Sequence, residues 1–231
     1  MINVSKNSEI NKDLQSEYEK VTLAYLKAWS LAFESDTPPC RINEFGIVDE
    51  SRYDTDNGIL FIGKETNGWK DEDFNNNCLF RNWMKTISIN GLPYNSHIKK
   101  HPTMWYNIGR WATLIHDPNK SLIDIANMRE DAISALGLIS FTNINKVRGN
   151  NVSGKEYEDL TSMAVVNDLL TKEIKILNPT TIICCGTYSK IKPLIKDFKG
   201  KIIKMPHPAA RKATLNMLEE LQSQIKRQEI I

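Results

Sequence analysis

The stretch GILFIGKETNGW, residues 58–69, runs from four bulky apolar residues through a glycine into a polar turn that ends in a tryptophan. A short apolar run that is bounded by glycines and contains isoleucine and phenylalanine predicts a strand buried on both faces, as in parallel sheets. The polar turn then lies at the carboxyl end of that strand. In open α/β sheets this edge is where ligands bind. The stretch therefore predicts both an α/β fold and the place of its site.

Three more short apolar runs follow, in 138–149, 180–186 and 201–206, and helical patterns separate them. Helices are expected over 121–137, with Ser121 as N-cap and Gly137 as stop, and over about 160–177, 187–198 and 212–227. Residues 42–49 are compatible with another short strand, but the apolar runs indicate four buried strands. Four such strands with helices between them predict a mainly parallel four-stranded sheet covered on both faces.

The chain is expected to form one domain over residues 1–231, because its length suits a single large core and no linker or repeat divides it. Apolar residues at helical spacing predict an N-terminal helix over 9–34, which the proline pair that follows would end. Residues from about 78 to 120 are rich in aromatic side chains and read as an irregular, partly helical insertion.

Composition excludes several classes of protein. Hydrophobic residues make up 41% and charged residues 25%, which is ordinary for a globular protein, and no apolar run approaches the length of about 18 residues that a membrane span needs. The first residues lack the apolar core of a secretory signal, so we expect a cytoplasmic protein with no membrane contact. The four cysteines, at 40, 78, 184 and 185, match no spacing of a metal or iron–sulfur site. The net charge of +2 means that any basic surface is local.

Polar residues follow three of the expected strands, in GKETNGW (63–69), TNINKVRGNN (142–151) and MPHPAARKA (205–213). Carboxyl ends of parallel strands meet at one edge, so these side chains should converge. A phosphate-binding loop is the tempting alternative for Gly63-Lys64, but residues 59–62 form the strand itself and leave no backbone free to wrap a phosphate. The pattern favours a site that combines a carboxylate, an amide and an imidazole.

These motifs, in this order, resemble those of the uracil-DNA glycosylase superfamily. Residues 63–67, GKETN, look like a divergent form of its first motif. Residues 142–148, TNINKVR, reproduce a spacing found in its iron–sulfur branch, and residues 207–211, HPAAR, are similar to its last motif. Residues 173–186 also resemble the helix–proline–strand–glycine step of the family. The resemblance spans about 58–215 and implies a three-layer αβα sandwich around the four-stranded sheet.

The sequence departs from the family at three points. The cysteine ligands of the iron–sulfur branch are missing, so neither a cluster nor any other metal or cofactor is expected. Thr66 stands where proline usually follows the acidic turn, which puts the loop geometry and the substrate in question. Arg211 stands where the family often inserts leucine into the duplex.

The chemistry of cleaving an N-glycosidic bond assigns two roles. Positive charge develops on the sugar and negative charge on the departing base, so a site should oppose both and supply water. Glu65 is the candidate to orient or activate that water. His207, held between two prolines, is the candidate to donate a hydrogen bond to the leaving base.

Base recognition calls for an amide and an aromatic face. Asn143 is the expected base reader, and Asn145 is the alternative if the register slips by two residues. Phe80 is the expected stacking ring, because it lies at a family-like distance beyond the first motif, and Trp69 is the next candidate. Contacts to DNA phosphates are expected from four basic residues: Lys146, Arg148, Arg211 and Lys212.

The sequence thus predicts a monomeric, monofunctional DNA glycosylase that flips out a uracil-like, damaged or modified base from single- or double-stranded DNA and hydrolyses its N-glycosidic bond. Two alternatives remain open. One is an inactive module of the same fold that binds modified DNA or a protein partner. The other is a hydrolase of free nucleosides.

Overall fold

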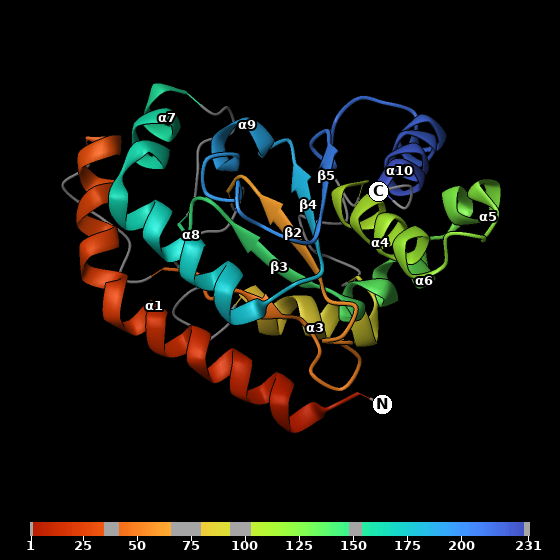
Figure 1. Ribbon diagram of the computed structural model, residues 1–231, viewed down its shortest axis with the longest axis horizontal. Helices are drawn as coiled ribbons and strands as arrows, with labels where there is room; N and C mark the ends of the chain where they lie inside the picture. The colour runs from red at the N-terminus through yellow and green to blue at the C-terminus, as the bar shows by residue number, and fades with distance from the viewer. Residues whose placement is uncertain (1, 35–41, 66–79, 93–102, 148–153, 229–231) are drawn as a thin grey trace.

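The computed structural model describes residues 2–34, 42–65, 80–92, 103–147 and 154–228. Within these ranges the chain is an α/β protein built on one mixed, mostly parallel sheet (Figure 1). The elements follow one another in the order α1 (Val4–Phe33), β1 (Gly46–Ile47), β2 (Ile59–Gly63), α3 (Phe80–Asn90), α4 (Thr103–His116), α5 (Leu122–Asn127), α6 (Glu130–Ser134), the 3-10 helix η2 (Ala135–Leu138), β3 (Ser140–Asn143), α7 (Lys155–Ser162), α8 (Ala164–Leu177), β4 (Thr181–Cys185), α9 (Tyr188–Ile191), β5 (Lys201–Met205) and α10 (Thr214–Gln228).

The sheet has the strand order β1-β3-β2-β4-β5. All four strands predicted from apolar runs are present, and they pair in parallel. The predicted number of four strands is wrong, because β1 adds a fifth strand that runs antiparallel to β3. Every residue of β2, β3 and β4 is buried, as expected for strands covered on both faces.

The fifth strand lies within residues 42–49, where the sequence was compatible with a short strand, but it has only two residues. Its outer edge is paired by a side chain from α1. The Asn11 Oδ1 atom accepts from the backbone nitrogen of Ile47 at 2.9 Å, and the Asn11 Nδ2 atom donates to its carbonyl oxygen at 3.1 Å. An amide side chain thus supplies the two hydrogen bonds that another strand would make.

The chain crosses from β2 to β3 through α3 to α6, and from β3 back to β4 through α7 and α8. These crossovers run in opposite directions along the sheet, so right-handed connections bring their helices to opposite sides. Figure 1 shows α1, α7 and α8 on one side, and α4, α6 and α10 on the other. The carboxyl ends of the parallel strands remain at one edge, between the two groups of helices.

The helix predicted over 121–137 is divided into α5, α6 and η2. Ser121 caps α5 as expected, since its hydroxyl accepts from the backbone nitrogen of Asp124 at 3.4 Å. The interruption falls at Met128, whose carbonyl oxygen accepts from the Arg110 guanidinium at 2.8 and 3.2 Å instead of continuing a helix. The segment 160–177 likewise divides at Met163, where the backbone is extended. The helix expected over 187–198 ends at Ile191.

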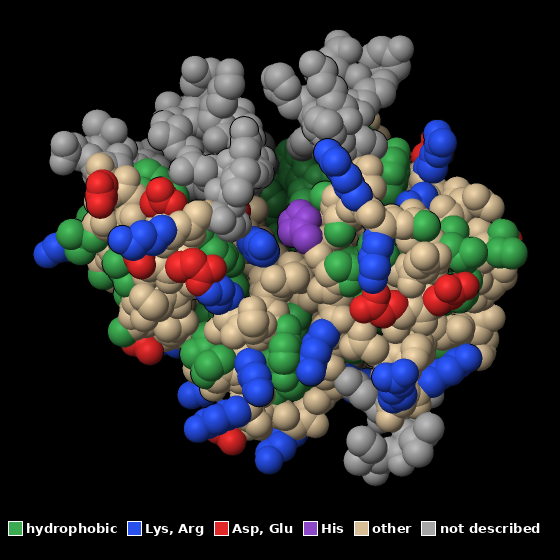
Figure 2. Space-filling model, turned by 90° about the horizontal axis from the view of Figure 1, so that it is seen from above, with side chains coloured by type: hydrophobic (Ala, Val, Ile, Leu, Met, Phe, Trp, Pro, Cys, Tyr) green, Lys and Arg blue, Asp and Glu red, His purple; other side chains and the backbone are tan. Residues whose placement is uncertain are grey.

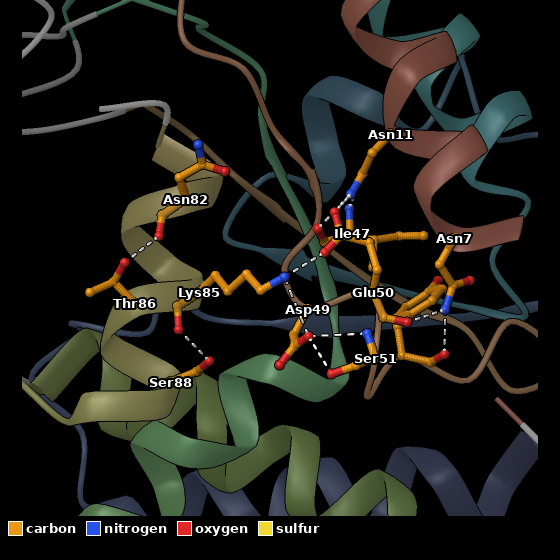
Figure 3. A network of polar contacts seen from close by, with 11 residues as sticks. Asn7, Asn11, Ile47, Asp49, Glu50, Ser51, Asn82, Lys85, Thr86 and Ser88 are labelled. Carbon is orange, nitrogen blue, oxygen red and sulfur yellow. Dashed lines mark hydrogen bonds and ion pairs between the residues drawn. The ribbon is translucent and has the colours of Figure 1, made fainter. Parts of the chain in front are cut away.

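The N-terminal helix begins at Val4, five residues before the expected start at residue 9. A polar network at the amino end of the strands anchors its first turns (Figure 3). The Asn7 Nδ2 atom donates to the carbonyl oxygen of Glu50 at 2.8 Å, and the Glu50 carboxylate accepts from Asn11 at 2.7 Å and from Lys85 at 2.8 Å. This network ties α1 and α3 to the turn after β1, on the edge of the sheet opposite the expected site.

A second network is fully buried just below the carboxyl ends of the strands. The Lys146 ammonium donates to the Glu173 carboxylate at 2.5 Å, to the Thr142 hydroxyl at 2.5 Å and to the Asn143 carbonyl oxygen at 2.6 Å. The Tyr18 hydroxyl, from α1, also donates to Glu173. Burial lowers the pKa of Lys146, and the charge of Glu173 opposes that shift. The network joins α1, β3 and α8 through one ion pair.

This ion pair generates a prediction about stability. Either Lys146→Met or Glu173→Leu should lower the free energy of unfolding by about 3 to 5 kcal/mol, because each leaves an uncompensated buried charged partner. The double variant Lys146→Met/Glu173→Leu should cost less than the sum of the two single changes. Urea denaturation of the three variants measures these differences.

The surface pair Lys172–Glu17, at 2.7 Å, supplies the matched control. Lys172→Ala should change the free energy of unfolding by less than about 1 kcal/mol, because exposed ion pairs are screened by water and salt. Equal costs for the buried and the exposed variants would contradict this account.

Candidate active site at the carboxyl edge of the sheet

The first and second motifs meet because the pairing of β2 and β3 continues beyond both strands. Gly63 is in register with Asn143. The Ile144 nitrogen then donates to the Gly63 carbonyl oxygen at 3.0 Å, and the Asn145 nitrogen donates to the Lys64 carbonyl oxygen at 2.9 Å. The sequence KE at 64–65 therefore runs beside the sequence IN at 144–145, as the convergence of strand ends predicted.

Gly63 is required by the close approach of the Asn143 side chain. A Cβ atom on residue 63 would lie 2.3 Å from the Asn143 Oδ1 atom, which is well inside contact distance. Asn143 is only 1% exposed. Its amide thus lies at the expected edge but beneath the surface, and its role as base reader stays a prediction.

The third motif is brought to the same edge by the end of β4. Gly186 has a φ of +71°, and its nitrogen donates to the Met205 carbonyl oxygen at 2.8 Å. A Cβ atom there would lie 3.2 Å from the His207 backbone nitrogen, so a glycine lets the two turns pack closely. The Thr187 hydroxyl donates to the Ile62 carbonyl oxygen at 2.9 Å. The turns after β2, β4 and β5 are thereby joined.

His207 is half-buried and its hydrogen bonding selects one tautomer. The Nδ1 atom accepts from the backbone nitrogen of Ala209 at 3.2 Å. In a neutral imidazole the other nitrogen then carries the proton, so Nε2 is a donor. Burial lowers the pKa of His207, and the positive charge of Lys64 lowers it further. Both effects favour the neutral ring, with Nε2–H available as a hydrogen-bond donor.

The turn that carries His207 is braced from α4. The Asn107 Nδ2 atom donates to the Pro208 carbonyl oxygen at 2.7 Å, and Asn107 is completely buried. The Asn107 Oδ1 atom accepts from Arg110 at 3.3 Å. Since Arg110 also binds the Met128 carbonyl oxygen, a chain of polar contacts runs from the break between α5 and α6 to the histidine turn.

Glu65 is half-buried, and burial raises the pKa of its carboxyl group. The Asn145 side chain and the charge of Lys64 oppose this shift. The Asn145 Nδ2 atom is buried and makes no regular hydrogen bond within the described ranges, while its Oδ1 atom accepts from the Val147 nitrogen at 3.0 Å. The amide nitrogen therefore lies near the Glu65 carboxylate. Lys64 acts electrostatically on both Glu65 and His207, which places the two at one edge.

Tyr157, on α7, is a further residue of this site that the sequence did not indicate. Its side chain is 3% exposed, and its hydroxyl oxygen has no hydrogen-bond partner among the residues that the structure describes. Burial raises the pKa of Tyr157, and the charge of Glu65 raises it further. The only signal in the sequence was a tyrosine in the first turns of a helix, which is usually a core residue. The electrostatic effect of Glu65 on Tyr157 follows from the tertiary fold alone.

Besides Asn143, two of the predicted site residues lie in the interior. Lys146 was expected to contact DNA phosphates, but its side chain is 0% exposed and paired with Glu173, so that prediction is wrong. Phe80 was expected to stack on a base, yet its ring is 2% exposed and packs against Phe45, Phe141 and Trp105. The ring offers no open face in this arrangement, which contradicts the predicted stacking role.

The remaining predicted contacts divide into two groups. Arg211 and Lys212 are exposed on the turn after β5, and Lys212 forms an ion pair with Glu220 at 2.8 Å. Trp69 and Arg148 lie outside the described residues. Figure 2 looks down on this face and shows Lys and Arg side chains around a histidine, beside a hollow with hydrophobic side chains at its base.

Comparisons with known proteins assign no family to this chain. No protein-family model matches it, and a search of curated proteins found no similar sequence. Among the described residues, no group of three or more His, Cys, Asp or Glu side chains is placed to hold a metal ion. No helix in the described ranges has the length and apolar character needed to cross a membrane. The site is therefore interpreted from its own geometry.

The unused hydroxyl of Tyr157 generates a prediction that separates a site residue from a core residue. Tyr157→Phe should raise the free energy of unfolding by about 1 kcal/mol, because it removes a buried polar group that lacks a partner. The matched control is Tyr25→Phe. The Tyr25 hydroxyl accepts from the backbone nitrogen of Lys146 at 2.8 Å and donates to the Ile144 carbonyl oxygen at 3.1 Å, so loss of this hydroxyl should destabilise the protein. Urea denaturation compares the two, and equal destabilisation would show that Tyr157 is an ordinary core residue.

Proposed function

We propose that this chain is a divergent member of the uracil-DNA glycosylase superfamily, a three-layer αβα sandwich that acts as a monofunctional DNA glycosylase. The observation that carries the proposal is that a half-buried carboxylate and a half-buried imidazole follow the carboxyl ends of strands in the same sheet. Glu65 supplies the carboxylate, and His207 supplies an Nε2–H donor. Their positions in the chain match the first and last motifs of the family.

The two groups suit the two charges that develop when an N-glycosidic bond breaks. The Glu65 carboxylate orients or deprotonates the attacking water, and its negative charge opposes the positive charge on the sugar. The His207 Nε2–H group donates to a carbonyl oxygen of the departing base and stabilises its negative charge. The Asn107 contact to Pro208 holds this donor in place, so that little reorganisation is needed during the reaction.

The amides on β3 and the loop after it have different parts in this proposal. Asn145 is a positioning residue, because its amide nitrogen is held near Glu65. Asn143 is the proposed base reader, and its burial means that the covering side chains have to move when a base enters. Of the basic residues predicted to contact phosphates, Arg211 and Lys212 are exposed near the site, and they are the proposed phosphate contacts. The proposed partner is DNA, bound by a cytoplasmic monomer without a cofactor.

A second candidate function is a binding module that has the fold without turnover. The observation that favours it is the burial of Asn143 and Phe80, two residues expected to contact a flipped base. Such a module would bind modified DNA and release nothing. The same experiment separates it from the glycosylase and from a hydrolase of free nucleosides.

That experiment is a panel of oligonucleotides that carry uracil, hypoxanthine, xanthine or bulky modified pyrimidines, followed by alkali treatment and a gel. The native protein should create alkali-labile sites in at least one of them. Glu65→Gln should slow release of the nucleobase by about 100- to 10,000-fold, because the carboxylate that acts as general base is lost. His207→Ala should slow it by about 100- to 1,000-fold, because the hydrogen-bond donor to the departing nucleobase is lost. Both variants should keep native stability and DNA binding.

Glu219→Gln, on the exposed face of α10, and His116→Ala, at the end of α4, are matched controls that should release base at the native rate. Binding without alkali-labile sites would favour the second candidate. Activity confined to free nucleosides would favour the third. Native rates in both site variants would eliminate the proposed mechanism.

The pH dependence follows from the directions of the two pKa shifts. Glu65 acts as a carboxylate, and its pKa lies above 4.5; His207 acts as a neutral ring, and its pKa lies below 6.5. Activity should therefore be low in acid and rise as both groups lose a proton, with the carboxyl limb above the ordinary pKa of 4.5 and the imidazole limb below the ordinary pKa of 6.5. A single-turnover pH–rate profile measures this, and Glu65→Gln should remove the limb that belongs to the carboxyl group.

A further inference from the structure

A lysine-rich segment leads away from the candidate site along the last strand of the sheet. Residues 188–204 contain six lysines and a single acidic residue, Asp197. This density contrasts with a chain whose net charge is only +2. The six residues are Lys190, Lys192, Lys196, Lys199, Lys201 and Lys204, and we call them the lysine ridge.

Four lysines of the ridge are exposed, and Lys190 and Lys201 are half-buried. Lys192, Lys196 and Lys199 are exposed and form no ion pair with any residue in the described ranges. Lys190 pairs with Glu158 of α7. Positive charges that remain unpaired on one surface attract a polyanion, and the attraction grows with each lysine.

The ridge is continuous with the site. Gly186 packs against the His207 backbone, and α9 begins two residues later at Tyr188. The Lys204 ammonium lies 4.0 Å from the centre of the half-buried Tyr188 ring. Proteins hold nucleic-acid strands by combining aromatic rings with positively charged side chains, as Tyr188 and Lys204 are combined near the candidate site. Figure 2 shows Lys and Arg side chains gathered on this part of the face, over α9 and β5.

Two other uses of this surface are disfavoured. β5 is an edge strand, but the Gln224 side chain of α10 accepts from the Lys204 nitrogen at 2.9 Å and donates to its carbonyl oxygen at 2.8 Å, so the edge is closed to an added strand there. A membrane surface would require apolar anchors beside the lysines. The large exposed hydrophobic side chains of the described residues lie near the N-terminus or on α1, α3, α5 and α10, and none is on α9 or β5.

We infer that the lysine ridge binds the phosphate backbone of the nucleic-acid strand whose base enters the candidate site. The inference rests on the proposed function for the identity of the strand. It adds a path for that strand, from the turn at Gly186 across Tyr188 and along β5. It also explains how a nearly neutral chain could hold DNA after Lys146 is excluded as a contact.

The test compares two triple variants that remove the same charge. Lys192→Ala/Lys196→Ala/Lys199→Ala removes the three unpaired members of the ridge. Lys6→Ala/Lys12→Ala/Lys27→Ala removes three exposed lysines of α1, far from the site along the chain. Binding of unmodified single-stranded and duplex oligonucleotides is followed by fluorescence anisotropy over a range of potassium chloride concentrations.

In a plot of log affinity against log salt, the ridge variant should have a slope that is less steep by about 2.7 for duplex and about 2.1 for single strands, since each phosphate contact contributes about 0.9 or 0.7. The α1 variant should keep the native slope. An unchanged slope in the ridge variant, or an equal change in both variants, would overturn the inference. So would absence of DNA binding by the native protein.

Vesicles containing phosphatidylglycerol form a separate arm. If the ridge variant lost vesicle binding while its DNA slope stayed native, the surface would be a lipid contact and the inference would be wrong. The proposed function fails independently, on the oligonucleotide panel. Loss of the salt slope in a protein that releases no base would support the ridge and reject the glycosylase.

Discussion

The buried ion pair between Lys146 and Glu173 is the interaction on which the carboxyl edge of the sheet depends. It joins the loop after β3 to α8, and Tyr18 extends it to α1. A buried charge is tolerated only when its partner and its remaining hydrogen bonds are all in place. Lys146 meets this requirement through Thr142 and the Asn143 carbonyl oxygen. The backbone that carries Asn145 is thereby held beside Glu65, so that one interior contact sets the geometry of the first two motifs.

Burial acts on the two proposed catalytic groups in opposite directions with a common result. It raises the pKa of Glu65 and lowers that of His207, because in each case it disfavours the charged form. Lys64 then restores charge to the carboxylate while it opposes charge on the imidazole. The charge of a single lysine thus favours different roles for the two groups, one as an anion and the other as a neutral donor.

The sequence was sufficient for the parts of the fold that depend on local pattern. The apolar runs located all four parallel strands, and Asn178-Pro179 located the end of α8, where Asn178 takes the left-handed conformation at φ 41°. Pattern failed where a distant side chain decided the outcome. Arg110 binds the Met128 carbonyl oxygen and divides a helix that looked continuous. Asn11 completes the edge of a two-residue strand within 42–49, a segment that the sequence did not count among the strands of the sheet.

At the site, the sequence by itself determined which residues follow the strands, and hence that Glu65, Asn143 and His207 come to one edge, because parallel strands end together. Only the tertiary structure decided which way each side chain points. Lys146 follows a strand as a surface cation would, but its side chain points inward and pairs with Glu173. The sequence did not indicate this pairing, because Glu173 lies 27 residues further along the chain. Tyr157 feels the charge of Glu65 from a helix whose own sequence suggests no function. Burial and pairing are properties of contacts between distant segments, and a linear pattern does not contain them.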